Sequence, residues 1–150
     1  MKRIFSMIIL MAIISVPAWA FEVNPDNVTG KKGDIIDVPV KLDKIYSAIE
    51  ARSFGFSVEY NGDVLSFVKP DKKGSLVESF TLVEGKENSH GKAKICASYF
   101  TDKVFLTDGL LLNIQFKVKE DAKGTSKIEL SNFKDALKGA TSTTASFILK

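Results

Sequence analysis

Apolar and polar residues alternate along several stretches of this chain, and such a period of two predicts β-strands that each bury one face. The alternation is clear in residues 36–42 and 53–60, and it is cleanest in residues 110–118. Residues 21–150 show no helical periodicity. These three stretches are therefore predicted as half-buried strands, with residues 110–118 as a long central one.

Shorter apolar stretches between turn signals complete the pattern. Glycine, asparagine, aspartate and proline cluster between the stretches, as is typical of reversals in antiparallel proteins. About nine strands at regular spacing predict an all-β fold, an antiparallel jelly-roll β-sandwich. The polar residues 84–91 are predicted to form a loop. The remaining predicted strands are residues 21–28, 64–68, 80–83, 93–100, 128–133 and 147–149.

Residues 53–68 are predicted to form a hairpin around Asn61-Gly62-Asp63, because these residue types tolerate the positive φ of a tight reversal. The polar face of its first strand consists of the small residues Ser53, Gly55 and Ser57. Two interpretations are open. The stretch is either an ordinary core hairpin, or its small open face accepts a binding partner.

The orientation of the strand predicted at residues 93–100 is ambiguous. Residues at odd positions from Ile95 to Tyr99 share one face, and residues at even positions from Cys96 to Phe100 share the other. Both faces contain apolar side chains, so periodicity alone does not identify the buried one. Excess apolar surface of this kind often marks an interaction patch.

The first twenty residues have the organisation of a signal peptide. Lys2 and Arg3 precede the apolar residues 4–16, and Ala18-Trp19-Ala20 forms a small-x-small cleavage site. The apolar run is shorter than the roughly 20 residues that a membrane span needs. We therefore expect residues 1–20 to be a cleaved signal peptide and residues 21–150 to be one domain in the periplasm or outside the cell, with no membrane span.

Charge and cysteine content limit the possible partners and crosslinks. Removing Lys2 and Arg3 lowers the formal net charge from +3 to about +1, so the composition gives no electrostatic reason to expect nucleic-acid binding. Cys96 is the only cysteine, which excludes an intrachain disulfide. We expect Cys96 to be a small buried side chain.

The sequence offers no constellation that supports catalysis. His90 is the only histidine and lies in a polar stretch that is typical of an exposed loop, so neither a nucleophile and base pair nor a zinc site is favoured. Carboxylates are scattered over turns and polar faces, and calcium loops of the Asp-x-Asp-x-Asp-Gly type are absent. We therefore expect a binding protein that is not an enzyme and that needs no cofactor or metal.

Four stretches together resemble the cohesin modules. Residues 49–67 contain Phe-x-Val-x-Tyr-Asn-x-x-Val-Leu-x-Phe, which is similar to the family's strand, turn and strand around Tyr-Asp-Pro-x-x-Leu. Residues 28–40 look like its opening Val-x-x-Gly and Val-Pro-Val, residues 108–119 like its Gly-x-x-x-x-Ile-x-Phe-x-Val strand, and residues 123–130 like its Gly-x-x-x-Ile-x-Leu. The resemblance implies a nine-stranded jelly roll without catalytic activity that docks calcium-loaded helical dockerin modules of polysaccharide-degrading enzymes.

The resemblance also implies a docking surface on one flat sheet face. Ser53 and Gly55 fall where the best-known members place polar residues, often Asn and Asp. Asp102 falls at the rim, and Cys96 and Phe100 are expected inside. The implied partner-binding residues are Ser53, Gly55, Ser57, Ile95, Ala97, Tyr99 and Asp102, and the implied partner is an exported protein, dockerin-bearing or other.

A carbohydrate-binding sandwich is the alternative, because it shares this architecture. Tyr46 and Tyr99 are aromatic residues outside the clear core pattern, and aromatic rings can stack on the rings of a polysaccharide. The sequence contains no evident row of such rings.

Overall fold

The computed structural model describes residues 20–150, in which all regular structure is β. The predicted signal peptide therefore lies almost entirely outside the described residues. Within the described part, no helix is long and apolar enough to cross a membrane. The strands are β1 (Glu22–Pro25), β2 (Val28–Gly30), β3 (Ile35–Asp43), β4 (Ile49–Ala51), β5 (Ser53–Glu59), β6 (Leu65–Asp71), β7 (Leu82–Ser89), β8 (Lys92–Ser98), β9 (Val104–Leu106), β10 (Gly109–Val118), β11 (Thr125–Asp135) and β12 (Ala145–Leu149).

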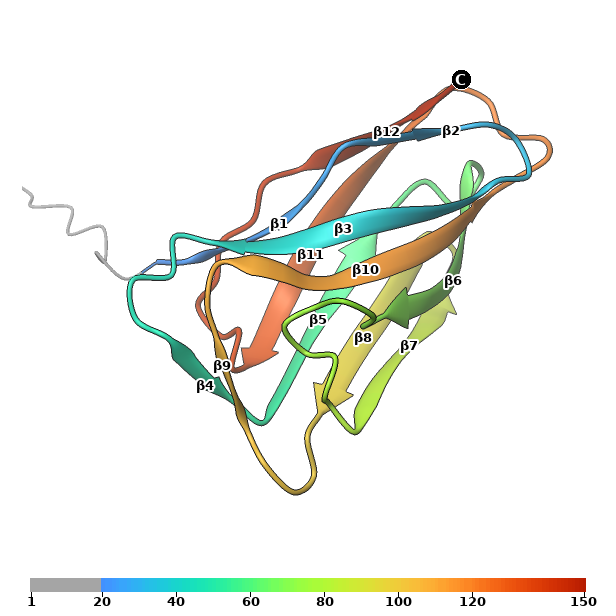
Figure 1. Ribbon diagram of the computed structural model, residues 1–150. Helices are drawn as coiled ribbons and strands as arrows, with labels where there is room; N and C mark the ends of the chain where they lie inside the picture. The colour runs from blue at the N-terminus through green and yellow to red at the C-terminus, as the bar shows by residue number, and fades with distance from the viewer. Residues whose placement is uncertain (1–19) are drawn as a thin grey trace, which may run out of the picture.

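Two sheets face each other across one core, and a short ribbon lies at one end (Figure 1). The four-stranded sheet has the order β1-β3-β10-β6, and the six-stranded sheet has the order β2-β12-β11-β5-β8-β7. Strands β4 and β9 pair only with each other. All strand pairs are antiparallel except β2 with β12. The predicted all-β jelly-roll sandwich is confirmed, with twelve strands in place of about nine because the short β2, β4 and β9 were not anticipated.

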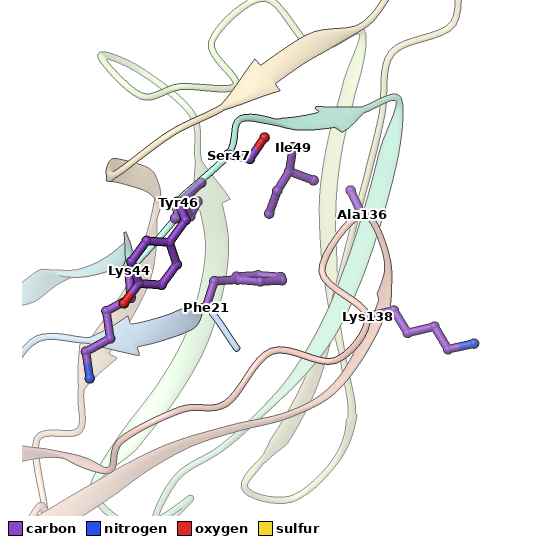
Figure 2. Close-up of a pocket in the computed structure, with 8 residues that line it drawn as sticks. Phe21, Lys44, Tyr46, Ser47, Ile49, Ala136 and Lys138 are labelled. Carbon is purple, nitrogen blue, oxygen red and sulfur yellow. The ribbon is translucent and has the colours of Figure 1, made fainter. Parts of the chain in front are cut away.

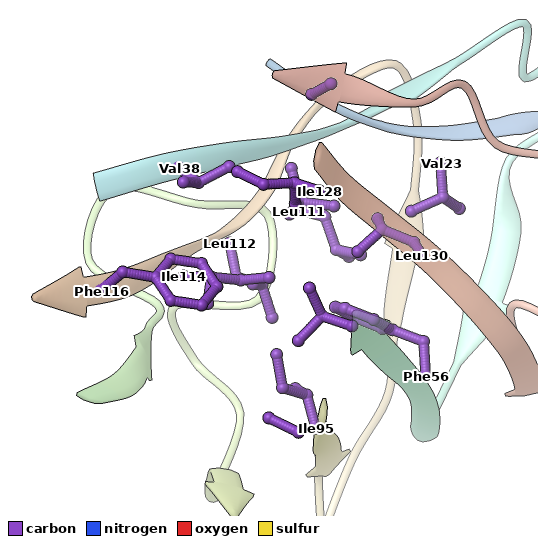
Figure 3. Close-up of a cluster of buried hydrophobic side chains, with 14 of the residues drawn as sticks. Val23, Val38, Phe56, Ile95, Leu111, Leu112, Ile114, Phe116, Ile128 and Leu130 are labelled. Atoms are coloured by element: carbon purple, nitrogen blue, oxygen red, sulfur yellow. The ribbon is translucent and has the colours of Figure 1, made fainter. Parts of the chain in front are cut away.

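The alternation along the chain places the apolar residues of both sheets in one shared core (Figure 3). Phe56 on β5 and Phe116 on β10 are almost completely inaccessible to solvent. The ring of Tyr60, just after β5, meets Phe116 edge-on with 4.9 Å between ring centroids, which joins the two sheets. Strand β10 lies between β3 and β6, as expected for the cleanest alternation in the sequence.

The hairpin predicted at residues 53–68 is wrong, because β5 and β6 belong to opposite sheets. The carbonyl oxygen of Asn61 accepts hydrogen bonds from the backbone N–H groups of Val64 and Leu65, both at 3.0 Å. This pattern is a helix-like turn, and neither Asn61 nor Gly62 has a positive φ. The chain therefore crosses from one sheet to the other where the turn composition favoured a return within the same sheet.

The loop predicted at residues 84–91 is also wrong for most of its length, because Glu84 to Ser89 belong to β7. Strand β7 is an edge of the six-stranded sheet and most of its residues are exposed. Charged residues protect such an edge from pairing with other chains, and they also remove the apolar alternation that identifies a strand in a sequence.

The turn between β7 and β8 comes very close to the crossing between the sheets. Gly91 has a φ of 76°, and its carbonyl oxygen accepts a hydrogen bond of 3.0 Å from the N–H of Tyr60. A Cβ atom added at Gly91 would lie 2.6 Å from the Tyr60 carbonyl oxygen. Glycine is therefore required here for two reasons, backbone conformation and space.

We expect Gly91→Ala to destabilise the protein more than Gly124→Ala. Gly124 has a similar φ of 80°, but a Cβ there would meet no atom within 4 Å. Both variants carry the left-handed conformational cost of about 1–2 kcal/mol. Only Gly91→Ala adds a steric cost of about 1–3 kcal/mol in the free energy of unfolding. Urea denaturation of the two variants measures this difference, and equal losses would contradict the close approach to Tyr60.

Candidate functional site

On the outer face of the six-stranded sheet, β5 carries three small residues between the longer side chains of β8 and β11, and we call this strip the β5 trough. Alternate residues of a strand share a face, so Ser53, Gly55 and Ser57 point away from the core. Gly55 pairs with Cys96 on β8 and with Lys134 on β11, and Ser57 pairs with Lys94 on β8. The trough thus has a floor of Ser53, Gly55 and Ser57 and sides formed by Lys94, Cys96 and Lys134.

The floor of the trough lies below its sides. Gly55 is buried, and Ser57 is only 7% exposed although it belongs to the outer face. A Cβ atom at Gly55 would lie 3.3 Å from the backbone oxygen of Ile95 and 4.0 Å from both Cys96 Sγ and the Cβ of Lys134. The absence of a side chain at Gly55 therefore lets its neighbours on β8 and β11 come close to the backbone of β5 from both sides.

An irregularity in β11 supplies the polar groups at the edge of the trough. The register between β11 and β5 shifts between Ser131 and Lys134, and Asn132 there has a φ of 54°. Asn132 Nδ2 donates a 3.4 Å hydrogen bond to the hydroxyl oxygen of Ser57, and the Ser53 hydroxyl donates to Asp135 Oδ2 at 3.1 Å. The bulge re-aims side chains toward the trough, as bulges beside functional sites commonly do.

The orientation implied for β8 is wrong. Ile95 is 0% and Ala97 1% exposed, so both face the core, whereas Cys96 is exposed and Phe100 is 68% exposed. Inward placement buries the apolar Ala93, Ile95 and Ala97 and leaves the other face of the strand exposed. The outward residues that the sequence reasoning missed are Lys94, Cys96 and Ser98. Their alternation with the apolar Ala93, Ile95 and Ala97 was the signal that could have identified them.

The last two implied residues lie beyond the end of β8. Tyr99 is partly buried and packs on Phe80 with 5.7 Å between ring centroids. Asp102 is exposed in the loop before β9, where its Oδ1 accepts a 2.8 Å hydrogen bond from the backbone N–H of Lys103. The structure therefore brings Ser53, Gly55 and Ser57 together, directs Ile95 and Ala97 inward, and leaves Tyr99 and Asp102 at one end of the sheet.

A buried tyrosine stands behind the opposite end of the trough. The Tyr60 hydroxyl donates a 2.8 Å hydrogen bond to Glu87 Oε1 on β7. Burial, followed by this hydrogen bond to a carboxylate, raises the pKa of the Tyr60 phenol above its ordinary value. The phenol therefore stays protonated and holds Glu87 on the inner side of the sheet edge.

A second hollow lies at the end of the sandwich, where β5 begins (Figure 2). Its volume is about 330 Å³, and Tyr46 beside it is 77% exposed. The backbone N–H of Ala136, which lines the hollow, donates to the Ser53 carbonyl oxygen at 3.2 Å, so the hollow adjoins the trough. Its lining consists of Phe21, Lys44, Ile45, Tyr46, Ser47, Ile49, Ala136 and Lys138.

The groups most relevant to catalysis lie on the surface, apart from the trough. His90 Nε2 is 3.1 Å from Asp63 Oδ1, and both side chains are largely exposed. Residues 20–150 contain no group of three or more His, Cys, Asp or Glu side chains placed to hold a metal ion. The arrangement that this part of the chain offers is a recessed, polar sheet face suited to contact with another molecule.

The fold and the open sheet face define a jelly-roll β-sandwich of the binding-module type. The family model described as Cohesin domain matches residues 21–148, and the chain belongs to the cohesin domain family. Direct sequence comparison with curated proteins gives no significant match.

Solved cohesin structures share the fold. The sixth cohesin of scaffoldin B from Acetivibrio cellulolyticus, solved with a Cel5 dockerin mutant, is 24% identical over 87% of this chain and 99% of its own, with a TM-score of 0.69. The OlpA cohesin from Clostridium thermocellum, solved with a dockerin, is 20% identical over 87% and 99%, with a TM-score of 0.66. A non-cellulosomal cohesin from the archaeon Archaeoglobus fulgidus is 17% identical over 87% and 91%, with a TM-score of 0.65.

We expect Cys96 to react with a thiol reagent in the folded protein, because its side chain is exposed beside Gly55. In the matched variant Cys96→Ser/Ala97→Cys, the single thiol replaces a side chain that is 1% exposed, so it should react only after unfolding. Labelling rates with and without urea measure the difference. Equal protection of both thiols would contradict the orientation of β8.

Proposed function

We propose that this chain is an exported cohesin module that docks a dockerin-bearing or similar exported protein on the outer face of its six-stranded sheet. The β5 trough carries this proposal, because its small floor residues permit close approach of a partner. The proposed contact surface centres on Ser53, Gly55 and Ser57 together with Lys94, Cys96 and Lys134.

The packing of β5 supports this role. Neighbouring strands on both sides fix its backbone, and its inner side chains belong to the core. The outer face is therefore rigid before any partner arrives. A preformed surface loses less conformational entropy on binding than a flexible one.

Related proteins support the kind of partner. The two cohesins from Acetivibrio cellulolyticus and Clostridium thermocellum described above were solved in complexes with dockerins. The Archaeoglobus fulgidus relative is described as non-cellulosomal, so the same fold also occurs outside cellulosomes. For this chain we propose a non-catalytic role associated with polysaccharide degradation.

Export is the part of the proposal that rests on residues 1–20 alone. Their basic, apolar and small-x-small segments support a cleaved signal peptide and release to the periplasm or the extracellular space. Dockerin-bearing enzymes and this module would then meet outside the cytoplasm.

We expect Gly55→Arg to abolish binding to a dockerin module while the fold remains intact. The arginine side chain would fill the trough and hold the partner surface away from β5. Isothermal titration of a panel of calcium-loaded dockerin modules against wild type and variant measures the effect. The proposal is wrong if no module binds the wild-type protein, or if the variant binds as tightly as wild type.

Two further variants control this experiment. Ile35→Arg places the same side chain on the outer face of the opposite sheet, at a residue that is 57% exposed, and should leave binding unchanged. The Cβ atom that Gly55→Arg introduces would press on the backbone oxygen of Ile95, so Cys96→Arg provides a second obstruction at an exposed neighbouring position. Circular dichroism of each variant tests whether the fold is retained.

Carbohydrate binding is the second candidate function, and the exposure of Tyr46 beside the hollow at the end of the sandwich favours it. Tyr99 gives less support, because its ring is partly buried against Phe80. If a polysaccharide binds here, it should slow wild type in affinity electrophoresis and slow Tyr46→Ala less. Unretarded migration of the wild type on every soluble polysaccharide tested would exclude this function.

A further inference from the structure

The outer face of the six-stranded sheet carries more positive than negative side chains. Strand alternation and register place five lysines and three glutamates there, and the carboxylate of Asp135 reaches the same face, where it accepts a hydrogen bond from the Ser53 hydroxyl. Lys92 and Glu59 form an ion pair of 3.5 Å at one end of the face, which leaves four lysines against the three carboxylates of Glu84, Glu129 and Asp135. The outward lysines are Lys86, Lys92, Lys94, Lys127 and Lys134, and the outward glutamates are Glu59, Glu84 and Glu129.

The excess positive charge flanks the β5 trough directly. Lys94 pairs with Ser57 on the β8 side, and Lys134 pairs with Gly55 on the β11 side. Among residues 20–150, neither lysine forms an ion pair within 4.0 Å. Two ammonium groups therefore stand on opposite sides of the trough without an ion-pair partner, while the Asp135 carboxylate at one end of the trough is hydrogen-bonded to Ser53.

A third lysine strengthens the charge on the β8 side. Lys86 is the direct cross-strand partner of Lys94, and like charges at opposed positions of a sheet are destabilising. Glu84 lies on the same side of the sheet near Cys96, but it forms no ion pair with Lys86 or Lys94. Lys86 also protects the exposed edge of β7 from pairing with other chains, and an incoming negative charge would relieve its repulsion from Lys94.

Docking over the trough would remove water from these ammonium groups. An ammonium group that loses its water without gaining an opposite charge opposes binding, and an electrostatically complementary partner avoids this cost. A basic partner surface would be repelled by Lys94 and Lys134, so the same two residues exclude the wrong partners.

We propose that the protein docked on the β5 trough is acidic at its contact surface and presents carboxylates to Lys94 and Lys134. This inference rests on the proposed docking function and specifies the chemistry of its partner. In this chain, the positive charges of Lys94 and Lys134 on the neighbouring strands would take the place of the polar pair that the resemblance implies at Ser53 and Gly55.

The test uses an alanine-based helical peptide with glutamates along one face and a matched peptide with glutamines in their place. We expect the acidic peptide to shift the amide NMR signals of Gly55, Ser57 and Lys94 at low salt, and the glutamine peptide to shift none of them. Raising the salt concentration to about 0.5 M should weaken binding, because it shortens the screening length well below 10 Å.

Charge reversal at Lys94 and Lys134 tests whether these two lysines bind the acidic peptide. Lys94→Glu/Lys134→Glu should weaken binding of the acidic peptide by at least about tenfold and allow a lysine-containing version of the peptide to bind instead. The control Lys117→Glu makes the same kind of change on the outer face of the opposite sheet and should leave affinity within about twofold. The lysines altered in the trough are exposed, so folding should be retained, as thermal unfolding will verify.

The outcomes separate this inference from the docking proposal. If a dockerin binds and Gly55→Arg abolishes binding, but charge reversal at Lys94 and Lys134 changes nothing, docking stands and the acidic partner is wrong. If no dockerin binds while the acidic peptide maps to the trough, the acidic partner stands and belongs to another protein family. Preferential binding of a soluble polyuronate in the trough would overturn the inference in favour of an acidic polysaccharide.

Discussion

The structure depends on the contact between the apolar faces of the two sheets. Phe56 and Phe116 are buried in the shared core, and the edge-on rings of Tyr60 and Phe116 join β5 to β10. A slip of one residue in the register of β5 would carry these apolar side chains to the solvent face. The core therefore fixes which residues of β5 point outward, and the outer face inherits its arrangement from the inner one.

The β5 trough follows from this constraint. Because Phe54, Phe56 and Val58 must face the core, Ser53, Gly55 and Ser57 must share the outer face. Their small size leaves a recess between β8 and β11, and the side chains of those two strands supply the charge. The shape of the trough thus comes from β5 and its charge from β8 and β11. Charged residues on the sides of the trough can therefore change without disturbing its floor.

The sequence predicted those parts of the fold that follow from local alternation. Strand β10 and the inward face of β5 were correct, because a half-buried strand leaves a period of two. Only the first residues of β7 were predicted as a strand, and Glu84 to Ser89 were predicted as a loop, because an exposed edge leaves no apolar period. The predicted pairing of β5 with β6 was wrong because Asn61-Gly62-Asp63 suits several kinds of turn. Which strands pair with each other also depends on residues that are distant in the sequence. At β8 the family resemblance implied the reverse of the observed orientation, in which Ala93, Ile95 and Ala97 face the core and Lys94 faces outward.

The pairing of β2 with β12 has a consequence for biogenesis. These strands lie at opposite ends of the described chain, and the N–H of Lys150 donates a 2.8 Å hydrogen bond to the Gly30 carbonyl oxygen. β5, likewise, pairs with β8 and β11, which follow it in the chain. The six-stranded sheet therefore cannot close until residues near 149 have left the ribosome, and such long-range pairing forms slowly. A nascent chain of this topology therefore cannot complete the six-stranded sheet before β12 has been synthesised.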